Sequence, residues 1–237
     1  MPIVVSGANI SGGVTISDGG NIVETGLVLN LDAGNSSSYP GSGTTWFDLS
    51  GNGNNGTLVN SPSYTTISGA QTFAFNGTNN RVSFTYQTPV QSNSTGFTWG
   101  AWIRANRNFD GDVVMGNRGT TPLQFYKMTT QKFEMYPAEV FATVTLTTWI
   151  YICAVWNGAG SSGGTNMTWY HNGVSVGLRD GDNPDFRPSL MPFNIGGDAA
   201  ANEFFQGYIA AAHVYNIALS AGQVTTNFNA MRGKFGV

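Results

Sequence analysis

The most apolar stretch of the chain is the run WIYICAVW at residues 149–156. Both alternating sets of side chains in it are apolar or aromatic, so a strand formed by this run has no solvent face and belongs inside a sheet that is covered on both sides. Two further β-prone runs, residues 167–171 and 174–178, are separated by Asn172 and Gly173. Asn-Gly between such runs is the strongest short-range hairpin signal, because both residues tolerate the positive φ angles of a type I′ turn. The pattern therefore predicts a buried antiparallel unit.

Many other segments alternate between apolar and polar positions with the period of two that is typical of strands. The expected strands fall at residues 27–32, 46–49, 71–75, 81–84, 97–103, 113–115, 123–128, 132–136, 140–144, 191–195 and 204–215. The two segments that flank Gly77 are expected to form a second hairpin, in which Phe73 and Phe75 face Val82 and Phe84.

One helix is predicted near the C-terminus. Ser220 is its expected N-cap, and Gln223 three positions later completes a capping box. Val224 and Phe228 lie on one face of this helix, and Gly233 is expected to end it. Many short strands, frequent turns and one terminal helix predict an all-β fold, a two-sheet antiparallel jelly-roll sandwich with one short C-terminal helix.

Composition supports one large β domain preceded by an arm. The 237 residues include 32 glycines and 41% hydrophobic residues, which suits many tight turns around a sizeable core. Residues 1–20 space Ile and Val through Ser, Gly and Asn and cannot close a core of their own, so we expect a docking or oligomerisation arm there. Residues 21–237 are expected to form the jelly-roll domain.

Charge and hydropathy narrow the range of partners. The formal charge is -3 without a basic cluster, which argues against nucleic acid. No run approaches the roughly 18 apolar residues of a membrane span, and the first residues lack the features of a signal peptide. We therefore expect a protein that is made in a cytosol without membrane insertion, and that stays there or leaves it by lysis or in an assembled particle.

The interior is expected to hold the single cysteine and most of the tryptophans. Cys153 lies inside the most apolar run, so an intrachain disulfide is excluded and a buried, inert thiol is expected. The tryptophans that fall inside strand patterns, and are assigned to the core, are Trp99, Trp102, Trp149, Trp156 and Trp169.

Seven short pieces of sequence carry a family resemblance. They are GLVLNLD at 26–32, DLSGNGNNGTL at 48–58, FNG at 75–77, FTWGAWI at 97–103, the hairpin at 149–176 with YHNG, FQGYI at 205–209 and VYNIALS at 214–220. Taken in this order, they resemble the laminin G-like, concanavalin A-like jelly-roll family. The resemblance implies a module used mostly for binding, often of glycans or proteins, sometimes with calcium at the rim of the sandwich.

The opening of the chain carries a second resemblance. The alternation of Ile and Val with Gly in residues 1–20 is similar to the start of structural proteins of tailed bacteriophages. This resemblance implies a virion structural protein, a capsid decoration or fibre component on the outer surface of the particle, whose arm contacts other virion proteins. Open strand edges favour a homo-oligomer. A free-standing bacterial lectin-like module is the alternative, and a polysaccharide hydrolase is a distant third.

The carboxylates do not suggest catalysis. Glycoside hydrolases usually need two carboxylates that face each other across the scissile bond. Glu134 and Glu139 are five positions apart and would face opposite ways on a continuous strand. The Glu-x-Asp-x-x-Glu strand of hydrolases with this fold is absent, and His171 and His213 are expected to flank a turn and to pack in a strand. The sequence therefore predicts a protein that is not an enzyme.

Two loops have oxygen ligands of the kind that calcium prefers. Asp48 and Asn52 stand at the first and fifth positions of a stretch that begins like an EF-hand loop, but the glutamate needed at the twelfth position is missing. The alternative is a turn whose Asx side chains cap their own backbone. Asp180, Asp182 and Asp185 form the densest acidic loop, which is either a calcium site or a solvated loop.

A glycan site requires an exposed aromatic ring for the apolar face of a sugar, with polar side chains that bind its hydroxyls. The loop and edge aromatics that meet the first requirement are Tyr39, Phe109, Tyr126, Tyr136 and Phe186. Asp185, Phe186 and Arg187 combine both kinds of side chain and are the favoured cell-surface glycan site, together with Tyr126 and Tyr136. Rim packing is the alternative for each of these rings.

Overall fold

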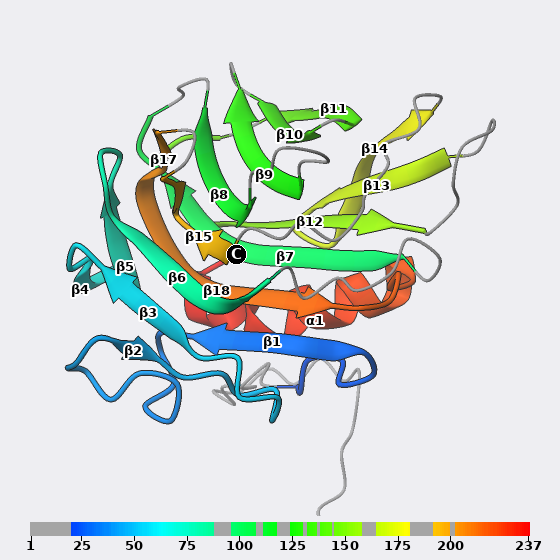
Figure 1. The fold of residues 1–237 in the computed structure, drawn as a ribbon. Coiled ribbons are helices and arrows are strands. Elements are labelled where there is room, and N and C mark those ends of the chain that lie inside the picture. Colours follow the sequence, from blue (N-terminus) through cyan, green and yellow to red (C-terminus); the bar gives the residue numbers. More distant parts are fainter. Residues whose placement is uncertain are drawn as a thin grey trace, which may run out of the picture.

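Two antiparallel β-sheets pack face to face, which confirms the predicted jelly-roll sandwich (Figure 1). The computed structural model describes residues 20–87, 96–107, 111–117, 124–129, 132–136, 138–143, 145–157, 165–180, 192–199 and 202–237. The arm predicted at residues 1–20 lies outside this part of the chain, except for Gly20, and stays a prediction.

The first sheet, sheet A, is arranged around β18 (Gln206–Tyr215), its longest strand. Its order is β14 (Val174–Asp180), β13 (Thr165–His171), β12 (Ile150–Trp156), β7 (Phe97–Ala105), β18, β5 (Ala70–Asn76) and β4 (Ser63–Ile67). A further strand, β1 (Leu27–Asp32), also pairs with β18, opposite residues 211–215, whereas β5 pairs with residues 206–209. The two halves of one edge of β18 therefore hold different strands.

The second sheet, sheet B, covers the inner face of sheet A. Its order is β11 (Ala138–Thr143), β10 (Lys132–Tyr136), β9 (Gln124–Thr129), β8 (Asp112–Asn117), β15 (Pro192–Ile195), β6 (Arg81–Gln87), β3 (Gly56–Val59) and β2 (Thr45–Trp46). A small two-stranded sheet, β16 (Gly197–Asp198) with β17 (Glu203–Phe204), lies beside them.

The predicted buried unit is confirmed. Every residue of β12 is buried, and the strand lies between β7 and β13 inside sheet A. Asn172 and Gly173 adopt φ angles of 50° and 77°, and they join β13 to β14 as an antiparallel hairpin. An all-apolar run thus marks a strand with partners on both edges and cover on both faces.

The second predicted hairpin, around Gly77, is wrong. β5 belongs to sheet A and β6 to sheet B, so the two strands do not pair with each other. The side-chain oxygen of Asn76 accepts hydrogen bonds from the backbone N–H groups of Thr78, Asn79 and Asn80 and fixes a turn that carries the chain across the sandwich. The apolar residues of both strands still face one core, because they reach it from opposite sheets.

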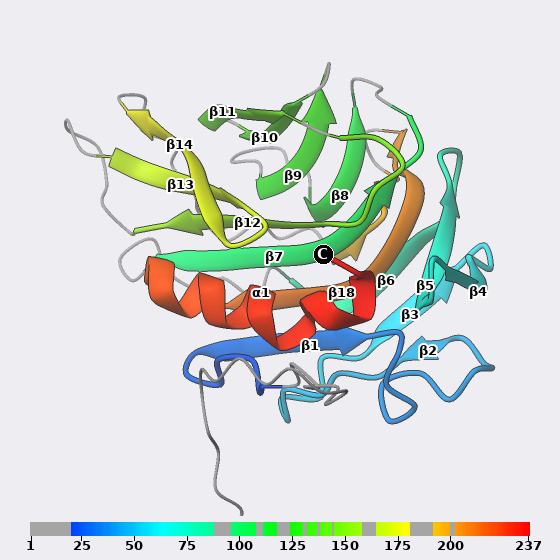
Figure 2. The same cartoon turned by 180° about the vertical axis from the view of Figure 1, so that it is seen from behind.

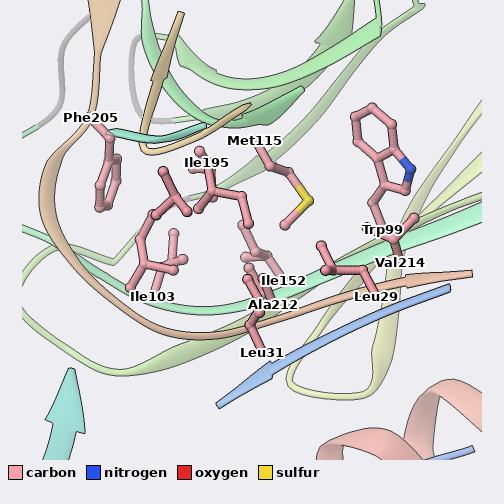
Figure 3. Close-up of a cluster of buried hydrophobic side chains, with 14 of the residues drawn as sticks. Leu29, Leu31, Trp99, Ile103, Met115, Ile152, Ile195, Phe205, Ala212 and Val214 are labelled. Atoms are coloured by element: carbon pink, nitrogen blue, oxygen red, sulfur yellow. The ribbon is translucent and has the colours of Figure 1, made fainter. Parts of the chain in front are cut away.

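An aromatic-rich core fills the space between the sheets (Figure 3). Leu29 and Leu31 of β1 and Trp99 and Ile103 of β7 reach it from sheet A, and Met115 of β8 reaches it from sheet B. All five side chains are almost completely buried. The core accounts for the inward half of the period-two pattern.

A second apolar cluster covers the opposite face of sheet A, beneath α1 (Ala221–Phe235) (Figure 2). Trp102 is on the same strand as Trp99 but points outward, and the ring of Phe235 stacks on it at 4.0 Å between ring centroids. Phe228 also packs on Trp102, at 5.6 Å. Helix α1 therefore acts as the cover that lets sheet A be apolar on both faces.

The start of α1 is as predicted, and its end is not. The hydroxyl of Ser220 accepts from the N–H of Gln223, whose side chain in turn accepts from the N–H of Ser220, so the capping box is confirmed. The helix continues past Gly233 and ends at Gly236, which adopts a left-handed φ of 70°. The extra residues bring Phe235 onto the sheet, and this contact outweighs the low helix propensity of glycine. No helix in the described ranges is long and apolar enough to cross a membrane.

The stacked contact at the end of α1 gives a test of this packing. Replacing Phe235 by Ala removes a buried ring, so we expect the free energy of unfolding to fall by about 3 kcal/mol. The exposed Phe47, 41% exposed, serves as the matched control, and Phe47→Ala should change the value by less than about 0.5 kcal/mol. Urea unfolding of both variants measures the difference, and equal losses would contradict the role assigned to α1.

Candidate functional site

Two adjoining hollows open where β1 ends, where the β4–β5 hairpin turns and where α1 ends. The first, of about 260 Å³, is lined by Asp32, Gly34, Gly69, Ala70, Gln71, Lys234 and Phe235. The second, of about 220 Å³, is lined by Gly34, Ser36, Tyr39, Pro40, Gly41, Tyr64 and Gln71. Because the hollows share Gly34 and Gln71, we treat them as one site, the rim groove.

A fixed ion pair lies in the first hollow. The side chain of Asp32 is 11% exposed, and its carboxylate accepts a hydrogen bond from the N–H of Gly34 at 2.9 Å and contacts Nζ of Lys234 at 2.5 Å. The side chain of Lys234 is 48% exposed. Alternation along β1 explains this position, because Leu29 and Leu31 point into the core and Asp32 therefore points outward. The ion pair presents one ammonium group to the solvent in a defined place.

Two tyrosines form the wall of the second hollow. The rings of Tyr39 and Tyr64 lie 4.8 Å apart, and Tyr39 packs edge-on against Phe73 at 4.8 Å. Their hydroxyls donate to the carbonyls of Gly43 and Ala33, at 3.0 Å each. Burial raises the pKa of Tyr64, and the nearby Tyr39 and Asp32 raise it further. The hydroxyl of Tyr64 therefore stays neutral. The ring of Tyr64 is half-buried and lines the groove.

The groove combines the groups that suit a neutral, hydroxyl-rich ligand. Tyr64 offers an aromatic surface, the exposed Gln71 offers an amide, and Lys234 offers an ammonium next to a carboxylate. A concave, partly apolar site with few fixed polar groups is typical of small-ligand binding. Nothing in this set resembles a nucleophile with a neighbouring base.

Of the aromatics named from the sequence, Tyr39 borders the groove, but its expected exposure is wrong: it is 6% exposed and packs on Tyr64 and Phe73, which is the alternative of rim packing. No local pattern in the sequence marked Gln71 or Lys234 as a site residue, and Asp32 was not singled out. Asp32 and Lys234 are 202 positions apart, and only the docking of α1 on sheet A brings them together. Asp32 alone has a local signal for a position outside the core, because it ends the LVLNLD strand on the face opposite Leu29 and Leu31.

The structure does not test the remaining candidates from the sequence. Phe109, Asp182, Asp185, Phe186 and Arg187 lie outside the described residues. For Asp180 at the end of β14, Tyr126 on β9 and Tyr136 on β10, the backbone alone is described. The calcium and glycan roles of these eight residues stay predictions.

Glu134 and Glu139 do not share a continuous strand, which is the condition under which they would face opposite ways. Glu134 is on β10 and Glu139 on β11, two short strands that pair antiparallel. The alternation of a single strand therefore does not relate the two residues. The spacing of five residues is therefore no argument that the two carboxylates lie on opposite faces.

The loop that contains Asp48 and Asn52 is held by its own hydrogen bonds. One oxygen of Asp48 accepts from the N–H groups of Asn30 and Ser50 at 2.9 Å each, and the other accepts from the hydroxyl of Ser50 at 2.7 Å and the N–H of Asn54 at 2.9 Å. The amide of Asn52 donates to the carbonyl of Leu27 at 3.1 Å. This is the geometry of a capped Asx turn. A calcium ion in this loop stays a prediction, and the described residues hold no group of three or more His, Cys, Asp or Glu side chains suited to a metal.

Comparisons with known proteins point to one family. The sequence profile described as the concanavalin A-like lectin/glucanases superfamily matches residues 76–225, more than half of the chain. A search of curated protein sequences found no relative.

Several solved structures share the fold. The binding domain of Paraclostridial Mosquitocidal Protein 1 is 16% identical, with a TM-score of 0.65 over 86% of this chain and 52% of that one. The binding domain of botulinum neurotoxin DC, solved with rat synaptotagmin II, is 13% identical, with a TM-score of 0.66 over 88% and 52%. Domain 4 of AbnA, an extracellular arabinanase from Geobacillus stearothermophilus solved with arabinotriose, is 17% identical, with a TM-score of 0.59 over 84% and 96%. The chain thus spans about half the length of the two toxin structures.

The hydrogen bonds of Asp48 lead to a test of the loop. Replacing Asp48 by Ala leaves the N–H of Asn30 and other donors without their acceptor, so we expect the free energy of unfolding to fall by about 2 kcal/mol. Asn52→Ala, which removes an exposed side chain from the same loop, should cost less than about 1 kcal/mol. Thermal unfolding with calcium and with a chelator measures both losses. A loss for Asp48→Ala that disappears in the chelator would show that the carboxylate serves a metal instead.

Proposed function

The chain belongs to the concanavalin A-like lectin/glucanases superfamily, and from this membership we propose that it is a non-enzymatic, lectin-like module that binds a glycan through the rim groove. The observation that carries the proposal is the juxtaposition of the half-exposed Tyr64 ring with the Asp32–Lys234 ion pair and the Gln71 amide. Membership of the superfamily accounts for the fold, and the side chains that line the groove account for the proposed glycan binding.

A sugar ring has both kinds of surface that the groove complements. Its C–H face packs on an aromatic ring such as Tyr64, which contributes apolar area with little loss of side-chain freedom. Its hydroxyls accept from Lys234 and Gln71, and they donate to the free lone pairs of Asp32. The two hollows together have room for a short oligosaccharide, and the shared Gln71 stands between successive sugar units.

The structural neighbours support a binding role. The arabinanase domain was solved with arabinotriose, and the botulinum neurotoxin domain with rat synaptotagmin II. Both are binding uses of this sandwich. We infer the glycan for the present chain, because its groove is lined by an aromatic ring and hydroxyl-binding groups and not by an extended apolar surface.

The groove also argues against hydrolysis at this site. Hydrolysis of a glycosidic bond by the usual mechanism needs two carboxylates on either side of the bond. Asp32 is the only carboxylate among the described residues that line the groove, and Lys234 already binds it. We therefore assign the groove to recognition.

The wider setting that we propose is a bacteriophage particle. Residues 1–20 resemble the start of phage structural proteins, so we place the jelly roll on the outer surface of a virion as a capsid decoration or a fibre component. In this role the arm docks on other virion proteins or on sister subunits, and the rim groove binds a cell-surface glycan. A free-standing bacterial lectin is the alternative, and the arm distinguishes the two.

Two variants test the groove. Gln71→Ala and Lys234→Met should each weaken binding of a glycan identified on an array by about tenfold, since each removes a hydrogen bond worth about 1.4 kcal/mol. Gln206→Ala changes a half-buried glutamine at the other end of β5 and β18 and should leave affinity unchanged. Titration calorimetry on the three proteins makes the comparison, with and without a calcium chelator.

Two results would overturn the assignment of the groove. Equal affinity in all three variants would move the glycan site elsewhere on the domain. Release of reducing sugar from alginate, agar or laminarin would make the protein a hydrolase.

The arm has a test of its own. Removing residues 2–20 should abolish copurification with intact particles while leaving glycan affinity unchanged, because the groove lies in the part of the chain that remains. Sedimentation of particles with full-length and truncated protein measures attachment. Copurification that survives the truncation would favour the free lectin.

A further inference from the structure

His213 is a buried polar side chain without a visible partner. It lies in β18 with 0% of its surface exposed, and in the described part of the chain neither ring nitrogen has a hydrogen-bond partner. A buried imidazole usually has at least one such bond. Ala211 and Tyr215, two positions away on each side, belong to the cluster beneath α1, so alternation places His213 under the same helix.

The sheet register identifies the neighbours of His213. Asn30 of β1 is opposite it on one side and Gly100 of β7 on the other, and Gly100 in turn is opposite Cys153 of β12. Asp32 of β1 is opposite Ala211, which makes it a diagonal neighbour of His213 on the same face, at roughly 7 Å. The ion pair of the rim groove therefore borders on this histidine.

Four elements place titratable or charged groups around the imidazole. These are Asp32 on β1, Tyr151 and Cys153 on β12, Tyr215 on β18 itself and Lys234 on α1. The ring of Tyr151 lies 6.4 Å from that of His213, and its hydroxyl reaches over Gly100. Asn227 of α1 donates to the hydroxyl of Tyr215. Asp32 is the one acidic group in this set, and Lys234 already binds it.

We propose that His213 makes the contact between sheet A and α1 sensitive to acid, and thereby regulates the rim groove, whose glycan role is the function proposed above. In the described residues neither ring nitrogen of His213 has a hydrogen-bond partner, and the one carboxylate near it, Asp32, is already bound by Lys234, so an imidazolium there is poorly compensated. Its charge also lies beneath the apolar side chains of Phe228 and Met231. Loosening of α1 removes Lys234 and Phe235 from the groove wall.

The direction of the pH effect follows from burial. Burial lowers the pKa of His213 from its ordinary 6.5 to about 4, with Asp32 opposing the shift and Lys234 adding to it. The docked helix therefore binds fewer protons than a loosened one, in which the imidazole regains its ordinary pKa. Docking is fully stable above pH 6.5, and its stability is lost progressively as the pH falls from 6.5 toward 4.

Cys153 is a built-in reporter of this change. It is the only cysteine in the chain, it is fully buried, and only Gly100 separates it from His213 across the sheet. Its reaction with 4,4′-dithiodipyridine, a reagent that works in acid, measures the opening of α1. Relative to glutathione at each pH, we expect the labelling rate of the wild-type protein to rise by about tenfold per pH unit between pH 6.5 and 4.5.

Variants attribute the response to one side chain. His213→Asn should remove most of the rise, whereas His171→Asn, at the other histidine of the chain, whose pKa burial also lowers, should leave most of it intact. A flat profile in the wild-type protein overturns the proposal even if His213→Asn fails to fold, and an equal rise in His213→Asn overturns it as well. The assay contains no glycan, so an acid response without glycan binding would refute the proposed function alone.

Discussion

The structure depends on burying both faces of one sheet. In β7, Trp99 points into the core between the sheets, and Trp102, three positions later, points into the cluster beneath α1. Neighbouring β12 is buried at every position for the same reason. A sheet with two apolar faces is stable in water only when both are covered. Sheet B covers one face and α1 the other, so the C-terminal helix is part of the fold and not an appendage.

Features that are encoded locally could largely be predicted. Period-two patterns located most of the strands but missed β3 and β4, Asn172-Gly173 located a hairpin, and Ser220 with Gln223 located the start of α1. The sequence was misleading where tertiary contacts determine the sheet to which a strand belongs or the residue at which a helix ends. Apolar alternation in β5 and β6 identified their buried faces but not their sheets, and Gly233 did not end a helix that Phe235 holds onto sheet A.

The rim groove could not be predicted for a related physical reason. Its ion pair joins the end of β1 to the end of α1, and its tyrosine wall comes from a loop and from β4. LVLNLD carries a family resemblance but no sign of a ligand site, because each side chain of the groove acquires its role from the packing of α1 on sheet A. Sequence reasoning favoured the acidic loop, where charges are dense within a few residues. The structure adds the rim groove, whose two charged lining residues, Asp32 and Lys234, are held in place by their ion pair.

The shared edge of β18 has a consequence for biosynthesis. Its far half pairs with β1, the first strand in the described part of the chain, and α1 then binds the segment before that strand through the hydrogen bond from the N–H of Val23 to the side-chain oxygen of Asn227 at 2.8 Å. In the described residues β1 therefore has no strand partner until β18 has been synthesised, and until then only nearby loops can bind it, as in the hydrogen bond from the N–H of Leu49 to the carbonyl of Asn30. Strand pairs of such long range are slow to form. One edge of LVLNLD thus stays open to wrong partners while the strands between β1 and β18 are made.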